Sequence, residues 1–234
     1  MLMTKNDWPV LDRWFPNRGA WSRSRYGAWL LGIYLLLGGA PYILINRFAA
    51  WRDVSTVDVR IPVDEALPYV PAMVVPYYSL YLYYPIAVWV AARQPVRHDG
   101  LLFFQRMLVV TWITFAMYLL FPVEIDLRDQ AVGAEGVFGA LMDGMHQADE
   151  PWNAWPSIHV LQSLLIVLFV RWARKKDGTW SAPLAATVWT ACGLLVASTV
   201  LIKQHFLFDV VSAITLVAVM WRWYILPGLN RTAN

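Results

Sequence analysis

Residues 101–121 read LLFFQRMLVVTWITFAMYLLF, an apolar stretch interrupted by Gln105 and Arg106. An α-helix rises ~1.5 Å per residue, so about 20 apolar residues cross the ~30 Å hydrocarbon core of a bilayer. Other stretches of this kind lie at 27–47, 70–92, 158–173, 183–202 and 206–226. The sequence therefore predicts an all-α fold, a bundle of six transmembrane helices.

The composition of the whole chain agrees with a membrane environment. Of its 234 residues, 59% are hydrophobic and 15% are charged, and the mean hydropathy of +0.45 is too high for an ordinary soluble domain. The pI of about 9.0 is compatible with nucleic-acid binding, but the basic residues stand in short groups beside apolar runs instead of forming one stripe. We therefore expect a single integral membrane domain over 1–234 and no nucleic-acid partner.

The basic residues predict the orientation of the chain. Six spans place both termini on one side, together with the loops at 93–100 and 172–182. That side carries thirteen Lys and Arg residues, namely Lys5, Arg13, Arg18, Arg23, Arg25, Arg93, Arg97, Arg171, Arg174, Lys175, Lys176, Arg222 and Arg231. The other side carries five, namely Arg47, Arg52, Arg60, Arg128 and Lys203. Because basic residues concentrate in cytoplasmic loops, we expect cytoplasmic termini in a bacterial inner (plasma) membrane, with the loops at 48–69 and 122–157 periplasmic or extracellular.

Two polar strings stand at the outer ends of predicted spans, WPSIH at 155–159 and STVLIKQHFLFD at 198–209. Pro156 suits the first turn of a helix, whose free N–H groups favour an anion. Asp209 lies in an apolar string, where an unpaired carboxylate costs roughly 2.5–3.5 kcal/mol on insertion scales. It therefore needs a partner, and His205 shares its helical face if the last span starts there.

These residue types suit nucleophilic attack on a phosphate. A carboxylate bonded to one ring nitrogen of His205 would fix its tautomer and leave the other nitrogen as the nucleophile. His159 could protonate the leaving oxygen. Ser157, Lys203 and Arg128 could hold the phosphate oxygens. A buried His–Asp pair that only ties two helices together is the competing interpretation.

The two strings resemble motifs of the type-2 phosphatidic acid phosphatase superfamily of membrane lipid phosphatases and phosphotransferases. That family has Lys-x6-Arg-Pro, then Pro-Ser-Gly-His, then Ser-Arg-x5-His-x3-Asp. Residues 156–159 match the second motif except at Ile158, and residues 198–209 match the third except at Thr199. The first motif is poor, because Phe121 stands at its lysine position and Asp129 follows Arg128.

The departures are similar to the branch that includes fungal inositol phosphorylceramide synthase, in which the motifs read Pro-Ser-Leu-His and Ser-Thr-x5-His-x3-Asp. The run IPVDEALPYVP at 61–71 also resembles that branch, and the likeness covers about 60–215. It implies a phosphohistidine at His205 and no metal or cofactor. The resemblance further implies roles for the other site residues: Asp209 orients, His159 protonates the departing alcohol, and Ser157, Ser198, Arg128 and Lys203 bind the phosphoryl group.

Several functional alternatives stay open. Water or an alcohol acceptor could take the phosphoryl group, so a lipid phosphatase and a head-group transferase similar to inositol phosphorylceramide or sphingomyelin synthase are both possible. A noncatalytic lipid or proton-coupled transporter would use the His–Asp pair as a proton relay. Neither the lipid, the acceptor nor the oligomeric state follows from the sequence.

Three other groups of residues have weaker functional interpretations. At Asp143, His146, Asp149 and Glu150 we prefer a solvated outer loop to a metal site. At Tyr77, Tyr81 and Tyr84 we prefer aromatic packing to binding of a lipid head group. Asp64 and Glu65 could recognise a polyol or cationic acceptor. We therefore expect the catalytic residues to lie in the two strings.

Overall fold

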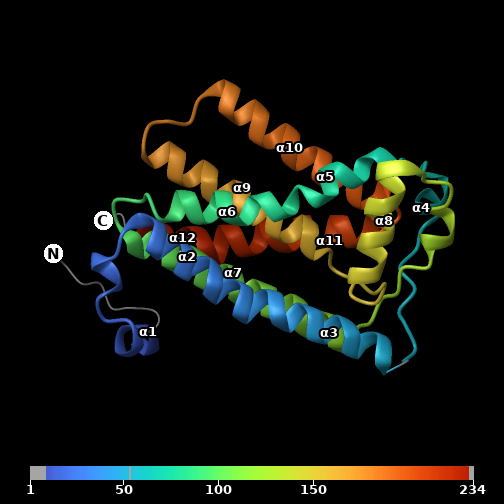
Figure 1. Ribbon diagram of the computed structural model, residues 1–234, viewed down its shortest axis with the longest axis horizontal. Helices are drawn as coiled ribbons and strands as arrows, with labels where there is room; N and C mark the ends of the chain where they lie inside the picture. Colours follow the sequence, from blue (N-terminus) through green and yellow to red (C-terminus); the bar gives the residue numbers. More distant parts are fainter. Residues whose placement is uncertain (1–8, 53, 232–234) are drawn as a thin grey trace.

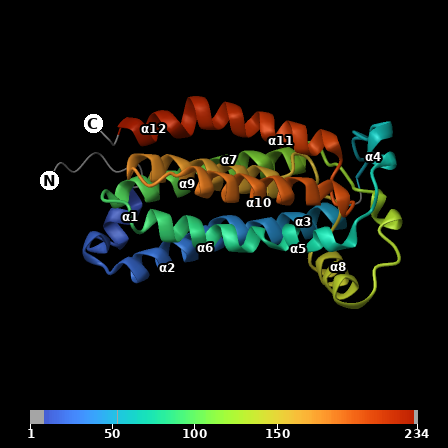
Figure 2. The same ribbon diagram turned by 90° about the horizontal axis from the view of Figure 1, so that it is seen from above.

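The computed structural model describes residues 9–52 and 54–231, and within these ranges it is helical, with one isolated bridge between Val123 and Asn153. The long helices lie side by side, with α4 and α8 at one end and α1 and α12 at the other (Figures 1 and 2). The α-helices are α1 (Pro9–Trp14), α2 (Arg23–Tyr34), α3 (Ala40–Trp51), α4 (Pro62–Ala66), α5 (Val74–Tyr78), α6 (Leu80–Ala91), α7 (Arg97–Leu120), α8 (Gly136–Ala148), α9 (Ile158–Lys176), α10 (Ala182–Leu201), α11 (Leu207–Met220) and α12 (Leu226–Arg231). The π-helical segments η2 (Leu35–Gly39) and η5 (Trp221–Ile225) join α2 to α3 and α11 to α12, and the short 3₁₀ turns are η1 (Arg18–Ala20), η3 (Pro71–Met73) and η4 (Leu127–Gln130).

Four helical stretches are long and apolar enough to cross a membrane. They are Arg23–Trp51, Arg97–Leu120, Ala182–Leu201 and Leu207–Asn230. The predicted all-α fold is therefore confirmed for the described residues, and the four stretches fit an integral membrane protein. The other two predicted spans are also helical, but α5 and α6 are separated at Ser79, and α9 ends in the basic string Arg174, Lys175 and Lys176. Six spans remain a prediction.

The first long helix contains a proline, Pro41, and a neighbouring helix compensates for it. Proline has no N–H, so the carbonyl of Leu37, four residues earlier, loses its usual partner. The indole Nε1 of Trp112 on α7 donates to that carbonyl at 2.9 Å. A neighbouring helix thus satisfies the freed group, as the apolar surroundings require, and the same bond joins α7 to η2.

Helix α9 lies at the centre of the bundle and packs against α6, α7, α10 and α11. Its Phe169 stacks on Phe103 of α7, with ring centroids 4.1 Å apart. Near the end that carries α1 and α12, α7 approaches α6 closely at Gly100. A Cβ atom there would lie 2.6 Å from Cβ of Ala91 and 3.0 Å from its carbonyl oxygen.

We predict that Gly100→Ala lowers the thermal stability of the detergent-solubilised protein. The added methyl group would collide with backbone atoms of α6, and overpacking of this kind typically costs about 1–3 kcal/mol. Gly193→Ala on α10 is the matched control, because no heavy atom lies within 4 Å of its Cβ position. Thermal unfolding, monitored by tryptophan fluorescence, measures the Tm of both variants and of the wild type. A Gly100→Ala protein as stable as the wild type would show that α6 and α7 do not approach this closely.

Candidate active site

The candidate site lies at the end of the bundle that carries α4 and α8, where α9 begins and the chain turns from α10 into α11. The backbone N–H groups of Gln204 and His205 both donate to the carbonyl of Thr199 at 3.0 Å, which closes α10. Lys203 in this turn has a φ of 59°, an uncommon conformation for a residue with a side chain. The tight reversal places His205 beside the start of α9.

His205 and Asp209 form the predicted pair. Nδ1 of His205 lies 3.3 Å from Oδ2 of Asp209, and their side chains are 4% and 0% exposed. The same Oδ2 accepts the N–H of Phe206 at 2.9 Å, which caps α11. The expected geometry was wrong in one respect: α11 begins at Leu207, so His205 precedes the helix and does not share a helical face with Asp209. A capping interaction brings the two residues together instead.

His159 completes a row of rings across the site. Its Nδ1 lies 3.4 Å from Nε2 of His205 and 3.4 Å from the hydroxyl of Tyr77. Both contacts are longer than an ordinary hydrogen bond of about 2.7–3.2 Å. The Tyr77 and His159 rings also pack together, with centroids 4.4 Å apart. The structure therefore places a second imidazole at the free nitrogen of His205, and adds Tyr77, for which aromatic packing had been the preferred interpretation.

Ser157 and Ser198 are both fully buried. Ser157 is the N-cap of α9, and its Oγ accepts the N–H of Val160 at 3.4 Å. Pro156 therefore precedes the cap, where the sequence had suggested the first helical turn. The N–H of Ser157 donates to the carbonyl of Asp209 at 3.2 Å, which joins α9 to α11. The hydroxyl of Ser198 donates to the carbonyl of Leu195 within its own helix at 2.6 Å.

Arg128 reaches the site through Gln204. One guanidinium nitrogen donates to the side-chain oxygen of Gln204 at 3.0 Å and to the carbonyl of Asp149 at 2.8 Å. The amide nitrogen of Gln204 lies 2.9 Å from Nε2 of His146 on α8. Burial and the nearby Arg128 lower the pKa of His146 below its ordinary value. A neutral His146 can accept from the Gln204 amide, so three side chains form a connected polar row beside His205.

Lys203 has a different environment from the one predicted. Its ammonium donates to the carbonyl oxygens of Asp64 at 2.9 Å and Leu67 at 2.7 Å, and the residue is 1% exposed. In this arrangement the charge faces the segment at 61–67 and not the two histidines. Buried carbonyls that need donors explain this placement.

Asp64 has contacts that the sequence did not predict. Its Oδ1 accepts the N–H of Leu207 at 2.7 Å, at the start of α11, and its Oδ2 accepts the N–H of Ile61 at 2.9 Å. The carboxylate therefore anchors the turn that carries His205. In the IPVDEA run, Pro62 followed by two acids signals the start of a capped helix. This local signal could not show that Asp64 also binds the N–H of Leu207. Glu65 instead pairs with Arg60 at 3.5 Å on the surface.

The described residues contain no group of three or more His, Cys, Asp and Glu side chains that could hold a metal ion. Asp149, once considered as a ligand, accepts the hydroxyl of Tyr42 at 2.6 Å. The described site therefore holds a carboxylate, Asp209, and two imidazoles in a row, and Arg128 is joined to the neighbouring Gln204.

No family model, curated protein or solved structure matches this chain. The interpretation of the site therefore depends on its own geometry and on the motifs in the sequence.

Proposed function

We propose that this chain is an integral membrane lipid phosphatase or phosphotransferase, which cleaves a phosphate ester or anhydride of a membrane lipid through a phosphohistidine at His205. The observation that carries the proposal is the position of the His205 ring, with Asp209 at Nδ1 and His159 at Nε2. A carboxylate at Nδ1 selects the tautomer in which Nε2 has a free electron pair. A purely structural His–Asp pair does not require a second imidazole at that nitrogen.

The reaction has two displacements. First, Nε2 of His205 attacks phosphorus, the bond from phosphorus to the leaving oxygen breaks, and that oxygen takes a proton from His159. Then water or an alcohol attacks phosphorus and gives its proton to His159, and the P–N bond breaks with its electron pair returning to His205. Asp209 stabilises the positive charge on the phosphorylated ring. Water yields phosphate, whereas an alcohol yields a new phosphate ester.

An in-line displacement places phosphorus between the attacking nitrogen and the acid. The 3.4 Å contact between the two histidines is too short for that, so the His159 side chain rotates away from His205 when substrate enters. Tyr77, packed on the His159 ring, is positioned to guide this movement.

Phosphate oxygens would be held by Arg128, Ser157 and the N–H groups at the start of α9. Arg128 would release the Gln204 side chain and bind the phosphate instead. Its Nε is buried and has no partner among the described residues, so it is a further donor for the phosphate. Lys203 and Ser198 would first have to release carbonyl groups. We therefore rank these two below Arg128 as phosphate ligands.

The proposed topology has six spans, with α5–α6 and α9 added to the four apolar stretches, in a bacterial inner (plasma) membrane. Its support is the distribution of charge. The basic end of α9 lies at the end of the bundle away from α4, α8 and the histidines. Since basic segments remain in the cytoplasm, the site faces the periplasm or the cell exterior.

One observation favours the transporter alternative. Below His159, the amide nitrogen of Gln162 donates to Tyr34 at 2.6 Å and lies 3.1 Å from the Thr111 hydroxyl, and the Tyr84 hydroxyl donates to its oxygen. A proton relay needs such groups to continue across the membrane. Deeper positions are instead fully buried apolar residues, including Met107, Leu165 and Phe169. These apolar positions interrupt the row of polar groups, so we favour the enzyme.

We predict that His205→Ala lowers turnover of lipid phosphates by at least about 10³-fold, because no neighbouring group replaces the imidazole nucleophile. The assay is phosphate or lipid product release by purified protein from a panel of labelled lipid phosphates, with and without candidate alcohols. His98→Ala is the matched control, because His98 lies in the first turn of α7 at the other end of the bundle. Wild-type turnover without His205, or equal loss in both variants, would contradict the assignment.

The orientation predicts the reactivity of single cysteines in a Cys192→Ala background. Val132→Cys lies in the outer loop and should react with an impermeant maleimide in intact cells whose outer barrier is permeabilised. Thr179→Cys, between α9 and α10, should react only after the inner membrane is opened. Both positions are exposed, and they avoid Gly136 and Gly178, whose positive φ angles disfavour other residues. The reverse pattern would place the site in the cytoplasm.

A further inference from the structure

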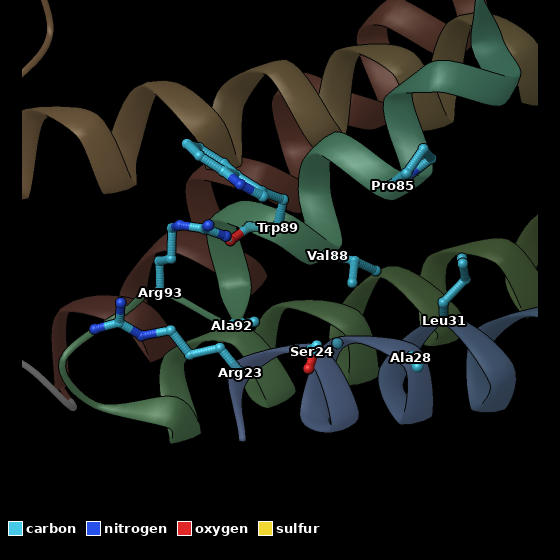
Figure 3. Close-up of a pocket in the computed structure, with 10 residues that line it drawn as sticks. Arg23, Ser24, Ala28, Leu31, Pro85, Val88, Trp89, Ala92 and Arg93 are labelled. Carbon is cyan, nitrogen blue, oxygen red and sulfur yellow. The ribbon is translucent and has the colours of Figure 1, made fainter. Parts of the chain in front are cut away.

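A groove lies between α2 and α6, near the end of the bundle away from the candidate site (Figure 3). Its volume is about 580 Å³, within the range of small-molecule sites. Arg23 and Arg93 stand at one end of the groove, and Leu31 and Pro85 lie toward the other. None of the predicted catalytic residues lines it, so the groove needs its own explanation.

The basic end of the groove carries two arginines and, among the described residues that line it, no acid. Arg23 and Arg93 are both exposed. The Arg93 guanidinium lies 4.1 Å above the Trp89 ring, and the Arg174 guanidinium of α9 lies 4.8 Å from the same ring. Stacking on an indole holds a guanidinium by its face and turns its N–H donors to the edge. Nη1 of Arg93 donates to the carbonyl of Trp89 at 3.5 Å, and the guanidinium has further N–H donors for a ligand. A phosphate, which Arg binds through two parallel hydrogen bonds, fits this arrangement.

The rest of the groove is lined by apolar residues, apart from Ser24. Small residues on α2 create the hollow: a Cβ at Gly27 would lie 3.0 Å from Val88 of α6, and Ala28 is the next residue. Residues 23 and 31 are eight positions apart on one helix, which corresponds to about 12 Å. The groove therefore runs from the depth of phosphate groups into the depth of acyl chains.

We propose that this groove binds one anionic phospholipid of the cytoplasmic leaflet, with its phosphate between Arg23 and Arg93 and part of an acyl chain against Leu31, Val88 and Pro85. Charge complementarity selects the occupant, because basic pockets between helices on the cytoplasmic side suit anionic head groups. The bound lipid joins α2 to α6. This proposal rests on the proposed orientation of the chain in the membrane and is independent of the chemistry at His205.

The test uses the full chain, purified in detergent and stripped of lipid. Native mass spectrometry and thermal unfolding measure the binding of phosphatidylglycerol and, separately, of phosphatidylcholine. Phosphatidylglycerol should bind more tightly and raise Tm, and the double variant Arg23→Gln/Arg93→Gln should weaken that binding at least about tenfold. Arg222→Gln is the matched control, because it removes an exposed charge on η5, outside the groove. It should bind the lipid as the wild type does.

A second variant tests the apolar part. Ala28 is exposed and lines the groove, so Ala28→Trp should fill it, reduce phosphatidylglycerol binding and leave the arginines in place. Equal binding of phosphatidylcholine, or an equal loss in Arg222→Gln, would overturn the proposal. So would full competition by glycerol 3-phosphate or inorganic phosphate, which would identify a site for a free anion. A dimer that forms through this face and excludes lipid would also overturn it.

Discussion

The turn between α10 and α11 has to satisfy its backbone groups in an environment with little water, and two buried carboxylates do so. Asp64 accepts the N–H of Leu207, and Asp209 accepts the N–H of Phe206. Lys203 satisfies carbonyl groups instead of N–H groups: its ammonium donates to the carbonyls of Asp64 and Leu67. Unsatisfied groups of this kind cost several kcal/mol each in an apolar medium. The segment at 61–67 is thereby bound to the turn that carries His205.

In the proposed mechanism, the same bonds hold the reacting groups in place. Asp209 caps α11 and orients His205 through a single oxygen, while its carbonyl accepts the N–H of Ser157 at the start of α9. A carboxylate with several fixed partners holds the imidazole more rigidly than a lone ion pair does, and a positioned nucleophile lowers the entropic cost of reaction. The stability of the turn and the reactivity that we propose for His205 therefore depend on the same few hydrogen bonds.

Hydropathy and charge predicted the helices and the membrane class, because apolar run length is a local property of the sequence. The His205–Asp209 pair was also predictable, since an acid in an apolar string must find a partner. The dual role of Asp64 and the direction of Lys203 were not, because their contacts join residues 136–143 positions apart. Nor could the sequence alone bring Tyr77 and His146 to the site, since the packing of α5 and α8 decides their positions.

The most direct test of the central claim is the identity of the covalent intermediate. The full chain is incubated briefly with lipid phosphate labelled at phosphorus, quenched without acid, digested and mapped. We predict a label on the peptide that contains His205. The label should be labile in acid and stable in base, as a phosphoramidate is, and it should be absent from His205→Ala. An acid-stable label on Ser157 or Ser198 would contradict it, because the nucleophile would then be a hydroxyl group.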